Sequence, residues 1–216
     1  KEVESWEKLT RILTHEIMNS LAPVTSISHT LLSASGDTKT LHQGLETIHT
    51  TSDRLLRFVD SYRAVTRIPT PQKAPFYLAE LVTEALSLIP HEGIEVEVSL
   101  DPADTMLYAD RTQMSQVLVN LLKNATEALM AQDCERKITI RSTIDAEERI
   151  QIEITNNGSA IPQEVAENIF TPFFTTKTDG SGIGLAVSRQ IIRLHGGSLR
   201  LKHNEEGRVT FAIVVE

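Results

Sequence analysis

Asn120-Leu121-Leu122-Lys123-Asn124-Ala125 lies within a helical pattern of apolar residues that runs from Thr112 to Ala131. The two asparagines are four residues apart, so both amides lie on one face of the predicted helix. An amide oxygen can bind Mg²⁺, a cation that prefers oxygen ligands, without adding negative charge beside a triphosphate. Lys123 could add positive charge there. Paired asparagines are more often an ordinary helix surface or a cap, so this stretch becomes informative only with a second one.

The second stretch is the glycine-rich run Gly180-Ser181-Gly182-Ile183-Gly184-Leu185, which precedes a predicted helix from Val187 to Leu194. Glycine exposes backbone N–H groups, and these groups together with a helix N-terminus can bind anionic phosphate. Lys177 lies just before the run and could add positive charge. The run is not a Walker A loop, because no Gly-Lys-Ser/Thr follows, and it is not a Rossmann turn, because no βαβ unit follows. A flexible loop has the same composition, but with the asparagine pair the run predicts a nucleotide site.

The N-terminal part reads as two long amphipathic helices. Apolar residues recur every three or four positions from Trp6 to Leu31 and again from Leu41 to Val65, with a turn at Ser33 to Asp37. Two helices joined by a short turn form an antiparallel hairpin. One hairpin cannot cover its own apolar stripe on both sides, so we expect two copies to form a four-helix bundle. Packing of the hairpin on the rest of its own chain is the alternative.

The remainder alternates between strand and helix patterns. The prolines between Ile68 and Pro75 predict a stiff, extended linker. We expect helices at residues 78–89, 112–131 and 187–194, with Asp110 as an N-cap, and strands at residues 94–98, 137–144, 149–155, 198–202 and 208–215. The predicted fold class is α+β: a helical hairpin over residues 1–67, a linker over 68–75, and an α/β sandwich over 76–216.

One histidine stands out in the first helix. His15 lies two residues from the nearest core positions on either side, about 200° around the helix, so we expect it to point away from the apolar stripe. A neutral imidazole is a competent nucleophile near pH 7, and Glu16 could take or orient its proton. Asn19 lies one turn further on, and Pro23 should bend the helix just beyond. A solvated surface histidine is the alternative, and this segment alone favours it.

Composition narrows the function classes. The net charge of -8 argues against nucleic acid as a partner, because phosphate binding needs a basic surface. Cys134 is the single cysteine, which excludes an internal disulfide and indicates a reducing, cytoplasmic setting. No apolar run reaches the roughly 18 residues that span a bilayer. Because Lys1 already lies in a helical pattern, we expect the chain to be a piece of a longer protein.

These segments, taken in order, resemble the kinase core of bacterial two-component sensor histidine kinases. His15 to Asn19 followed by Pro23 is similar to the phosphoacceptor box of that family. The remaining boxes follow in the family's order: the N box at Asn120 to Ala125, the first glycine box at Asn156 to Ile161, the F box at Phe170 to Phe174, the second glycine box at Gly180 to Gly184, and the end of the domain at His195 to Gly197 and Thr210-Phe211.

The resemblance implies the Bergerat ATP-binding fold shared with gyrase, Hsp90 and MutL, with ATP and Mg²⁺ as cofactors. It makes His15 the phosphorylated residue and Glu16 its acid/base helper. Asn19 would position water for dephosphorylation of a response regulator, and Asn124 would hold Mg²⁺. Asn120 stands where hydrolytic relatives carry a general-base glutamate, which fits phosphoryl transfer to histidine rather than hydrolysis.

The resemblance also implies partners and a setting. The expected partners are the receiver domain of a response regulator and a second copy of the chain, with no nucleic acid. The expected setting is the cytoplasmic part of a membrane-anchored sensor, attached to the membrane only through upstream segments. The implied nucleotide-binding residues are Asn120, Lys123, Asn124, Asn156, Gly158, Lys177, Gly180, Gly182, Gly184, Leu185 and Thr210. The segment from Gly158 to Gly182 would be a lid, with Phe173 and Phe174 as apolar anchors, although either could be plain core.

Two positions depart from the family pattern. Asn156 stands where the first glycine box usually has an aspartate that accepts the adenine amino group. An asparagine keeps a carbonyl acceptor but loses the charge, and a charge-assisted bond is roughly twice as strong as a neutral one. Ala160 replaces a glycine of the same box. The alternatives are therefore a degenerate module that binds nucleotide weakly and acts as a phosphatase or scaffold, and a Bergerat-fold ATPase.

Overall fold

The computed structural model describes residues 2–33, 38–130, 135–177 and 180–215, and it divides into two compact units, Lys1–Thr66 and Arg67–Glu216. Most of the predicted turn at residues 33–37, as well as Cys134 and Asp179, lies outside the described residues. The α+β class predicted from the sequence is confirmed.

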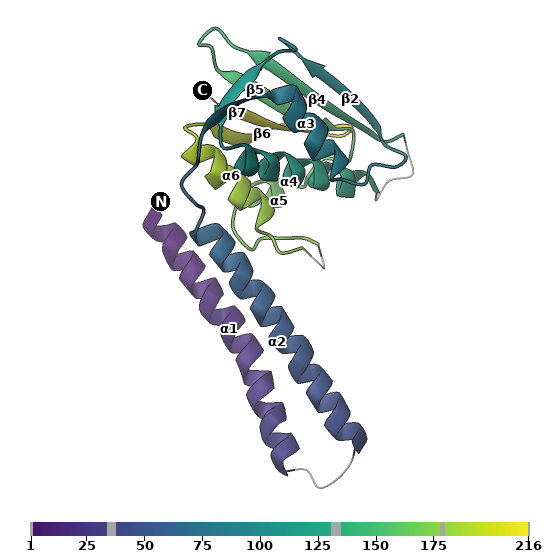
Figure 1. Ribbon diagram of the computed structural model, residues 1–216. Coiled ribbons are helices and arrows are strands. Elements are labelled where there is room, and N and C mark those ends of the chain that lie inside the picture. Colours follow the sequence, from purple (N-terminus) through teal and green to yellow (C-terminus); the bar gives the residue numbers. More distant parts are fainter. Residues whose placement is uncertain (1, 34–37, 131–134, 178–179, 216) are drawn as a thin grey trace. The chain divides into compact units, whose positions relative to one another are not determined.

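The first unit is a hairpin of two long helices, α1 (Glu2–Ser33) and α2 (Thr38–Thr66) (Figure 1). The helices approach closely at Gly44, where an added Cβ would lie 2.7 Å from Cδ2 of Leu31 and would require that side chain to shift. α1 continues through Pro23, and the bend expected at that residue stays a prediction. Large apolar side chains remain exposed along the hairpin, namely Met18, Leu21, Leu41, Leu45 and Leu56.

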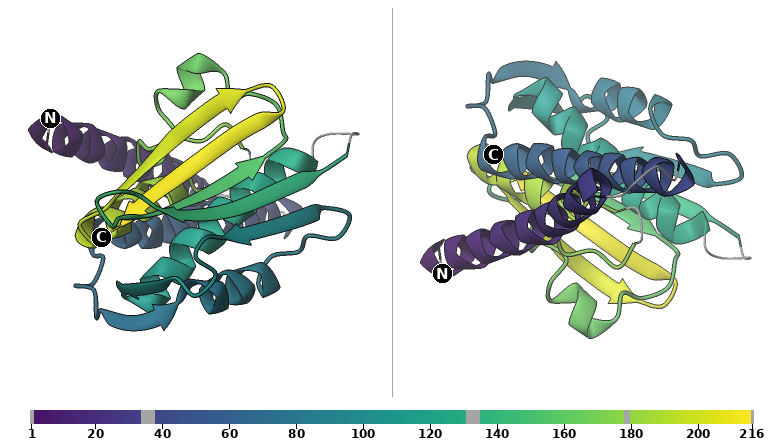
Figure 2. Two further views of the ribbon diagram at one scale, coloured as in Figure 1. Left: turned by 90° about the horizontal axis from the view of Figure 1, so that it is seen from above. Right: turned by 90° about the horizontal axis from the view of Figure 1, so that it is seen from below.

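The second unit is built on a five-stranded mixed sheet with the order β2-β4-β5-β7-β6. β2 pairs with β4 in parallel, and the other neighbours are antiparallel. The strands are β2 (Glu95–Leu100), β4 (Lys137–Ile144), β5 (Ile150–Asn156), β6 (Ser198–Glu205) and β7 (Arg208–Val215). β2 and β6 lie at opposite edges of the sheet (Figure 2).

Helices cover one face of this sheet (Figure 1). α4 (Arg111–Met130) packs on β4 and β5, α6 (Gly184–Leu194) packs on β6, and α3 (Leu78–Ser87) packs beside α4. Alternate residues of β5 point into the layer between sheet and helices, as the two-residue period of a strand requires. The buried face of α4 supplies most of the helical side of this core, with Leu118, Leu121 and Leu122 each 1% exposed.

Three short elements were not predicted. β1 (Ala74–Tyr77) pairs antiparallel with β3 (Met106–Ala109), and α5 is the helix Gln163–Ala166. β1 takes two residues from the expected linker, and a ribbon edge tolerates Pro75 there because proline donates no backbone hydrogen bond. Four-residue elements carry too little periodicity to be recognised in a sequence. α6 also begins earlier than expected, at Gly184 rather than Val187.

Asp110 fixes the start of α4. Its Oδ1 accepts a hydrogen bond from the Gln113 N–H at 3.1 Å, which confirms the predicted N-cap, and its Oδ2 accepts one from the Gln72 N–H at 2.8 Å. Its own N–H donates to Nε2 of the buried His195 at 3.0 Å, while Nδ1 of that ring donates to the Ile191 carbonyl at 2.8 Å. The histidine is therefore a neutral tautomer that joins the start of α4 to the end of α6.

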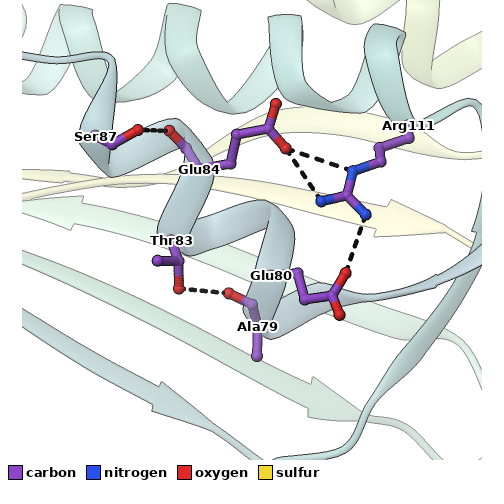
Figure 3. Close-up of polar contacts among 6 residues, drawn as sticks. All are labelled: Ala79, Glu80, Thr83, Glu84, Ser87 and Arg111. Carbon is purple, nitrogen blue, oxygen red and sulfur yellow. Dashed lines mark hydrogen bonds and ion pairs between the residues drawn. The ribbon is translucent and has the colours of Figure 1, made fainter.

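Arg111, the next residue, ties α4 to α3 at the surface (Figure 3). Its guanidinium donates to Glu80 at 3.0 Å and to Glu84 at 3.2 Å, and it lies 5.8 Å from the centre of the Phe76 ring. Hydrogen bonds to Glu80 and Glu84 raise the pKa of Arg111 above its ordinary value. The two glutamates are one turn apart on α3, so a single arginine holds both and orients the two helices.

We predict that Asp110→Ala lowers the free energy of unfolding by about 1 kcal/mol at pH 7, because the cap is lost. Asp110→Asn keeps a capping oxygen and should cost less. Burial raises the pKa of Asp110, but hydrogen bonds from the backbone of Gln72, Gln113 and Thr112 outweigh that effect and lower it below the ordinary value. The stabilisation from the charge is thus present above the unfolded-state pKa, about 3.9, and is lost as the pH falls through the lower folded-state pKa.

The measurement is urea unfolding followed by circular dichroism at pH 7 and near pH 3. The native chain should lose more stability in acid than Asp110→Asn does. Asp104→Ala, which removes an exposed aspartate, is the control and should change little. Equal stability of Asp110→Ala and the native chain at pH 7 would contradict the assignment of the cap.

Candidate functional site

A cavity of about 940 Å³ lies within the second unit. One wall is a face of α4, and the floor includes Val209 and Phe211 of β7. The rest of the lining comes mainly from the segment Gly158–Gly182, here named the lid segment, and from the first residues of α6. The segments that form it come from distant parts of the sequence, and only the packing of α4 and α6 on the sheet brings them together.

Asn120, Asn124 and Gly184 line the part of the cavity where α4 meets the first turn of α6; we name it the phosphate end, after the ligand that the sequence predicts there. The Asn120 Nδ2 donates to the Gly184 carbonyl at 3.4 Å and to the Ser188 hydroxyl at 3.2 Å, which joins α4 to the first turn of α6. Among the described residues, no side chain caps the start of α6. The first N–H groups of that helix therefore remain available to an anion, as the glycine-rich run predicted.

A cation already lies against the predicted magnesium ligand. The Asn124 Oδ1 accepts a hydrogen bond from the Lys177 Nζ at 3.4 Å, and the same ammonium forms an ion pair with Glu127. The Nζ of Lys123 lies 3.9 Å from the Glu127 carboxylate. Glu127 was not predicted from the sequence, although its position three residues after Asn124 places it on the same helix face.

The donor set at this end suits Mg²⁺. It offers an amide oxygen from Asn124 and a carboxylate from Glu127, and both are hard oxygen ligands. The described residues contain no group of three or more His, Cys, Asp or Glu side chains that could hold a metal alone. A magnesium ion here would therefore complete its shell with water and substrate phosphates, as this cation usually does.

Asn156 and Ala128 lie together beside Gly158, and Val209 lines the cavity as they do; we name this part the base end, after the role that the sequence predicts for Asn156. Asn156 is the last residue of β5 and is 4% exposed. Its Nδ2 packs against Gly158, where an added Cβ would lie 2.6 Å away, so this glycine leaves room for the amide. Among the described residues, that Nδ2 has no hydrogen-bond partner. Asn156 thus brings a buried amide with an unpaired N–H donor to this part of the cavity, beside the apolar Ala128.

The two ends lie at opposite ends of one face of α4. Asn120 borders Gly184, with the Gly184 Cβ position 3.6 Å from the amide carbon, whereas Ala128 borders Gly158, with the corresponding distance 3.7 Å. Eight residues of α-helix span about 12 Å. A ligand with an anionic end and a flat, largely apolar end separated by such a distance fits this cavity, and a nucleotide has that form.

The β6–β7 hairpin holds the start of the lid segment. The Asn204 side chain both accepts from the Ile161 N–H and donates to the Ile161 carbonyl, each at 2.7 Å. The Ala160 N–H donates to Glu206 at 3.1 Å. The Gly207 N–H donates to the Gly158 carbonyl at 3.1 Å. Ala160, which departs from the family's glycine, is therefore accommodated within a well-bonded backbone.

Phenylalanines hold the rest of the lid segment. Phe170 packs edge to face on Phe211, with ring centres 6.4 Å apart, and the Arg189 guanidinium lies 4.7 Å from the Phe170 ring centre. Phe174 lines the cavity, whereas Phe173 is half-buried and has a φ of 66°. The Phe173 N–H donates to the Gly182 carbonyl at 2.9 Å, which closes the lid segment onto the glycine-rich run.

The predicted residues of the glycine-rich run line the cavity, and Thr210 does not. Gly180, Gly182, Gly184 and Leu185 all lie in its wall. The prediction for Thr210 is corrected, because its hydroxyl bonds to the Thr155 hydroxyl at 2.9 Å on the sheet face opposite Asn156. Val209 and Phe211 face the cavity instead. A shift of one residue along a strand moves a side chain to the other face.

The residues predicted to accept the phosphoryl group lie in the first unit. His15 and Glu16 belong to α1, but their side chains lie outside the part of the chain that the structure describes. Asn19 is exposed on the same helix. The roles expected of these residues stay predictions.

Comparison with known proteins identifies the second unit. Residues 109–216 match the family model of histidine kinase-, DNA gyrase B-, and HSP90-like ATPases. The chain belongs to this family. Its fold agrees with that of a solved histidine kinase of the family: it is 37% identical to the catalytic domain of histidine kinase ThkA, with a TM-score of 0.59, over 67% of this chain and 95% of that one. The Bergerat fold implied by the sequence motifs is thereby confirmed.

Curated relatives of this histidine kinase-like chain are sensor kinases. It is 34% identical over 208 residues to sensor protein FixL of Bradyrhizobium diazoefficiens, over 92% of this chain and 41% of FixL. It is 30% identical to the signal transduction histidine-protein kinase AtoS of Escherichia coli, over 94% of this chain and 33% of AtoS. The chain thus spans less than half the length of these relatives. None of its described helices is long and apolar enough to cross a membrane.

One solved histidine kinase is similar to this chain over both units. ThkA crystallised with response regulator protein TrrA is 29% identical to this chain, with a TM-score of 0.66, over 99% of this chain and 62% of that one. The expectation of a two-component sensor histidine kinase is therefore confirmed at the level of the family.

We predict that Gly182→Ala weakens Mg-ATP binding by about tenfold or more, because an added Cβ would lie 2.6 Å from the carbonyl carbon of Phe173 and force the lid segment to move. Gly93→Ala is a matched control: it has a similar positive φ, 74° against 65°, but no described atom lies within 4 Å of its Cβ position. Both variants should lose about 1–2 kcal/mol of stability from backbone strain. Calorimetry should show weaker binding for Gly182→Ala alone, and equal affinities would contradict the assigned wall.

Proposed function

We propose that this chain is the core of an ATP-dependent protein histidine kinase that phosphorylates itself on His15 and passes the phosphoryl group to an aspartate of a response regulator. The observation that carries the proposal is the amide of Asn120 at the phosphate end, held by Gly184 and Ser188. An amide cannot deprotonate water, so this position favours transfer over hydrolysis. The Glu127 carboxylate in the same wall is paired with lysines rather than free to act as a base.

In the first proposed step, an imidazole nitrogen of His15 forms a bond to the γ-phosphorus of ATP. The bond from that phosphorus to the bridging oxygen breaks, ADP leaves, and Glu16 takes or orients the imidazole proton. Asn124 would hold Mg²⁺, which would neutralise charge on the phosphates. Such a transfer depends on positioning and charge neutralisation rather than on covalent chemistry by the protein. In the second step the phosphorus–nitrogen bond breaks as a carboxylate of the regulator takes the phosphoryl group.

The proposed partners have separate support. ThkA, a homologue that spans both units, was solved with a response regulator, which supports such a partner here. Large apolar side chains exposed on the hairpin support a homodimer through α1 and α2, because a four-helix bundle would bury them. The homologues are sensor proteins of greater length, so we propose that this core is the cytoplasmic part of a membrane-anchored sensor.

Incubation with ATP labelled at the γ-phosphate should label the chain, and His15→Ala should abolish the label. The label should be lost in acid and kept in alkali, as expected of a phosphorus–nitrogen bond. His29→Ala, which removes another histidine of α1, is the control and should keep the label. A label that survives in His15→Ala would refute the role of His15.

A second candidate function rests on the unpaired amide of Asn156. In this case the chain binds nucleotide poorly and dephosphorylates its regulator, with Asn19 positioning the attacking water. This second candidate predicts that calorimetry detects little Mg-ATP binding by the native chain and that Asn156→Asp restores the binding. A phosphorylated receiver domain should then lose phosphate in the presence of the native chain and keep it with Asn19→Ala. Ordinary affinity of the native chain for Mg-ATP would remove the basis of this candidate.

A further inference from the structure

Asn156 is a buried amide whose Nδ2 no described residue holds in place. The side chain is 4% exposed, lines the base end of the cavity, and has an Nδ2 without a hydrogen-bond partner among the described residues. A buried N–H donor without a partner is unfavourable, because it has given up its bonds to water. A ligand atom that accepts a hydrogen bond would remove that penalty.

The neighbouring residue shows what a fixed amide looks like in this sheet. The Asn157 Oδ1 accepts from the Lys137 N–H, and its Nδ2 donates to the Glu135 carbonyl, each at 2.8 Å. Turning that amide by 180° would break both hydrogen bonds. It would also place Nδ2 against the Lys137 N–H and Oδ1 against the Glu135 carbonyl. For Asn156, the same turn breaks no bond at Nδ2, and it exchanges the carbonyl oxygen for an N–H donor.

Apolar residues of the cavity lining lie near this asparagine. Ala128 borders Gly158, as the Asn156 Nδ2 does, and Val209 lines the cavity from β7. Val209 is also directly opposite Asn156 in the register of β5 and β7, so no hydroxyl from that position bonds to the amide. A base that contacts residue 156 therefore meets the amide of the asparagine itself.

Purine bases differ at position 6, the position that the resemblance to histidine kinases places at residue 156. The 6-amino group of adenine donates a hydrogen bond, whereas the 6-oxo group of guanine or hypoxanthine accepts one. A carboxylate only accepts, so it attracts the amino group and repels the oxo group. An amide that can turn satisfies either group. We infer that this cavity binds 6-oxopurine nucleotides as well as adenine nucleotides, and that Asn156 is the residue that permits it. The inference rests on the proposed nucleotide site.

Calorimetry with Mg-ADP and Mg-IDP tests this inference without phosphoryl transfer during the titration. Hypoxanthine differs from adenine only at position 6 and the adjacent ring nitrogen, so IDP isolates the contact. We expect the two dissociation constants of the native chain to lie within about tenfold, as two neutral hydrogen bonds would give. Asn156→Asp should weaken IDP relative to ADP by at least about tenfold more, because the carboxylate offers no donor and adds a charge.

Asn157→Asp is the matched control. It adds the same charge one residue away, at an amide that does not line the cavity, so the ratio of the two constants should match that of the native chain. Thermal melting would establish that both variants fold, and if Asn156→Asp does not, the ratio for the native chain decides the question.

Each outcome has a distinct meaning. If ADP binds and IDP binds more than about tenfold more weakly, or not at all, the inference is wrong and the proposed nucleotide site stands. An unchanged ratio in Asn156→Asp would also overturn it, because residue 156 would then not contact position 6. If neither nucleotide binds, the nucleotide site and the inference fall together.

Discussion

α4 packs its apolar face, which includes Leu118, Leu121 and Leu122, against β4 and β5. Burial of a leucine side chain stabilises a fold by about 1.5–3 kcal/mol, so rotating this helix on the sheet would be costly. Because the helix repeats every 3.6 residues, the same packing turns Asn120 and Asn124 toward the cavity. The core and the candidate site are therefore set by one constraint, the orientation of α4.

The rest of the site is positioned against that helix. Asp110 and His195 join the start of α4 to the end of α6, while Asn120 joins the middle of α4 to the first turn of α6. α6 is thus held at both ends, and its uncapped N-terminus lies at the phosphate end of the cavity. Lys177 brings a positive charge from the lid segment to Asn124 and Glu127. This charge lies where the triphosphate of a bound nucleotide would be.

Long helices were predicted from the sequence more accurately than short strands. α1, α2 and α4 have many helical turns, and their periodicity predicted the ends of α4 to within one residue and those of α1 and α2 to within about four. β1 and β3 are four residues each and depend on pairing with one another, so the isolated segments gave no signal. The site residues on α4 and in the glycine-rich run were predicted, because their spacing is local. Glu127 was missed, although its helical position next to Asn124 could have revealed it.

The order of the boxes and the residue types within them determined the family and the Bergerat fold, because such a series of local motifs is specific without any knowledge of packing. Tertiary structure decided which neighbours each side chain meets. It turned Thr210 away from the cavity and Val209 toward it, because the face of a strand residue depends on register. It also fixed the amide of Asn157 while leaving Nδ2 of Asn156 unpaired among the described residues. The two are adjacent asparagines, and the difference between them comes from partners that are distant in the chain.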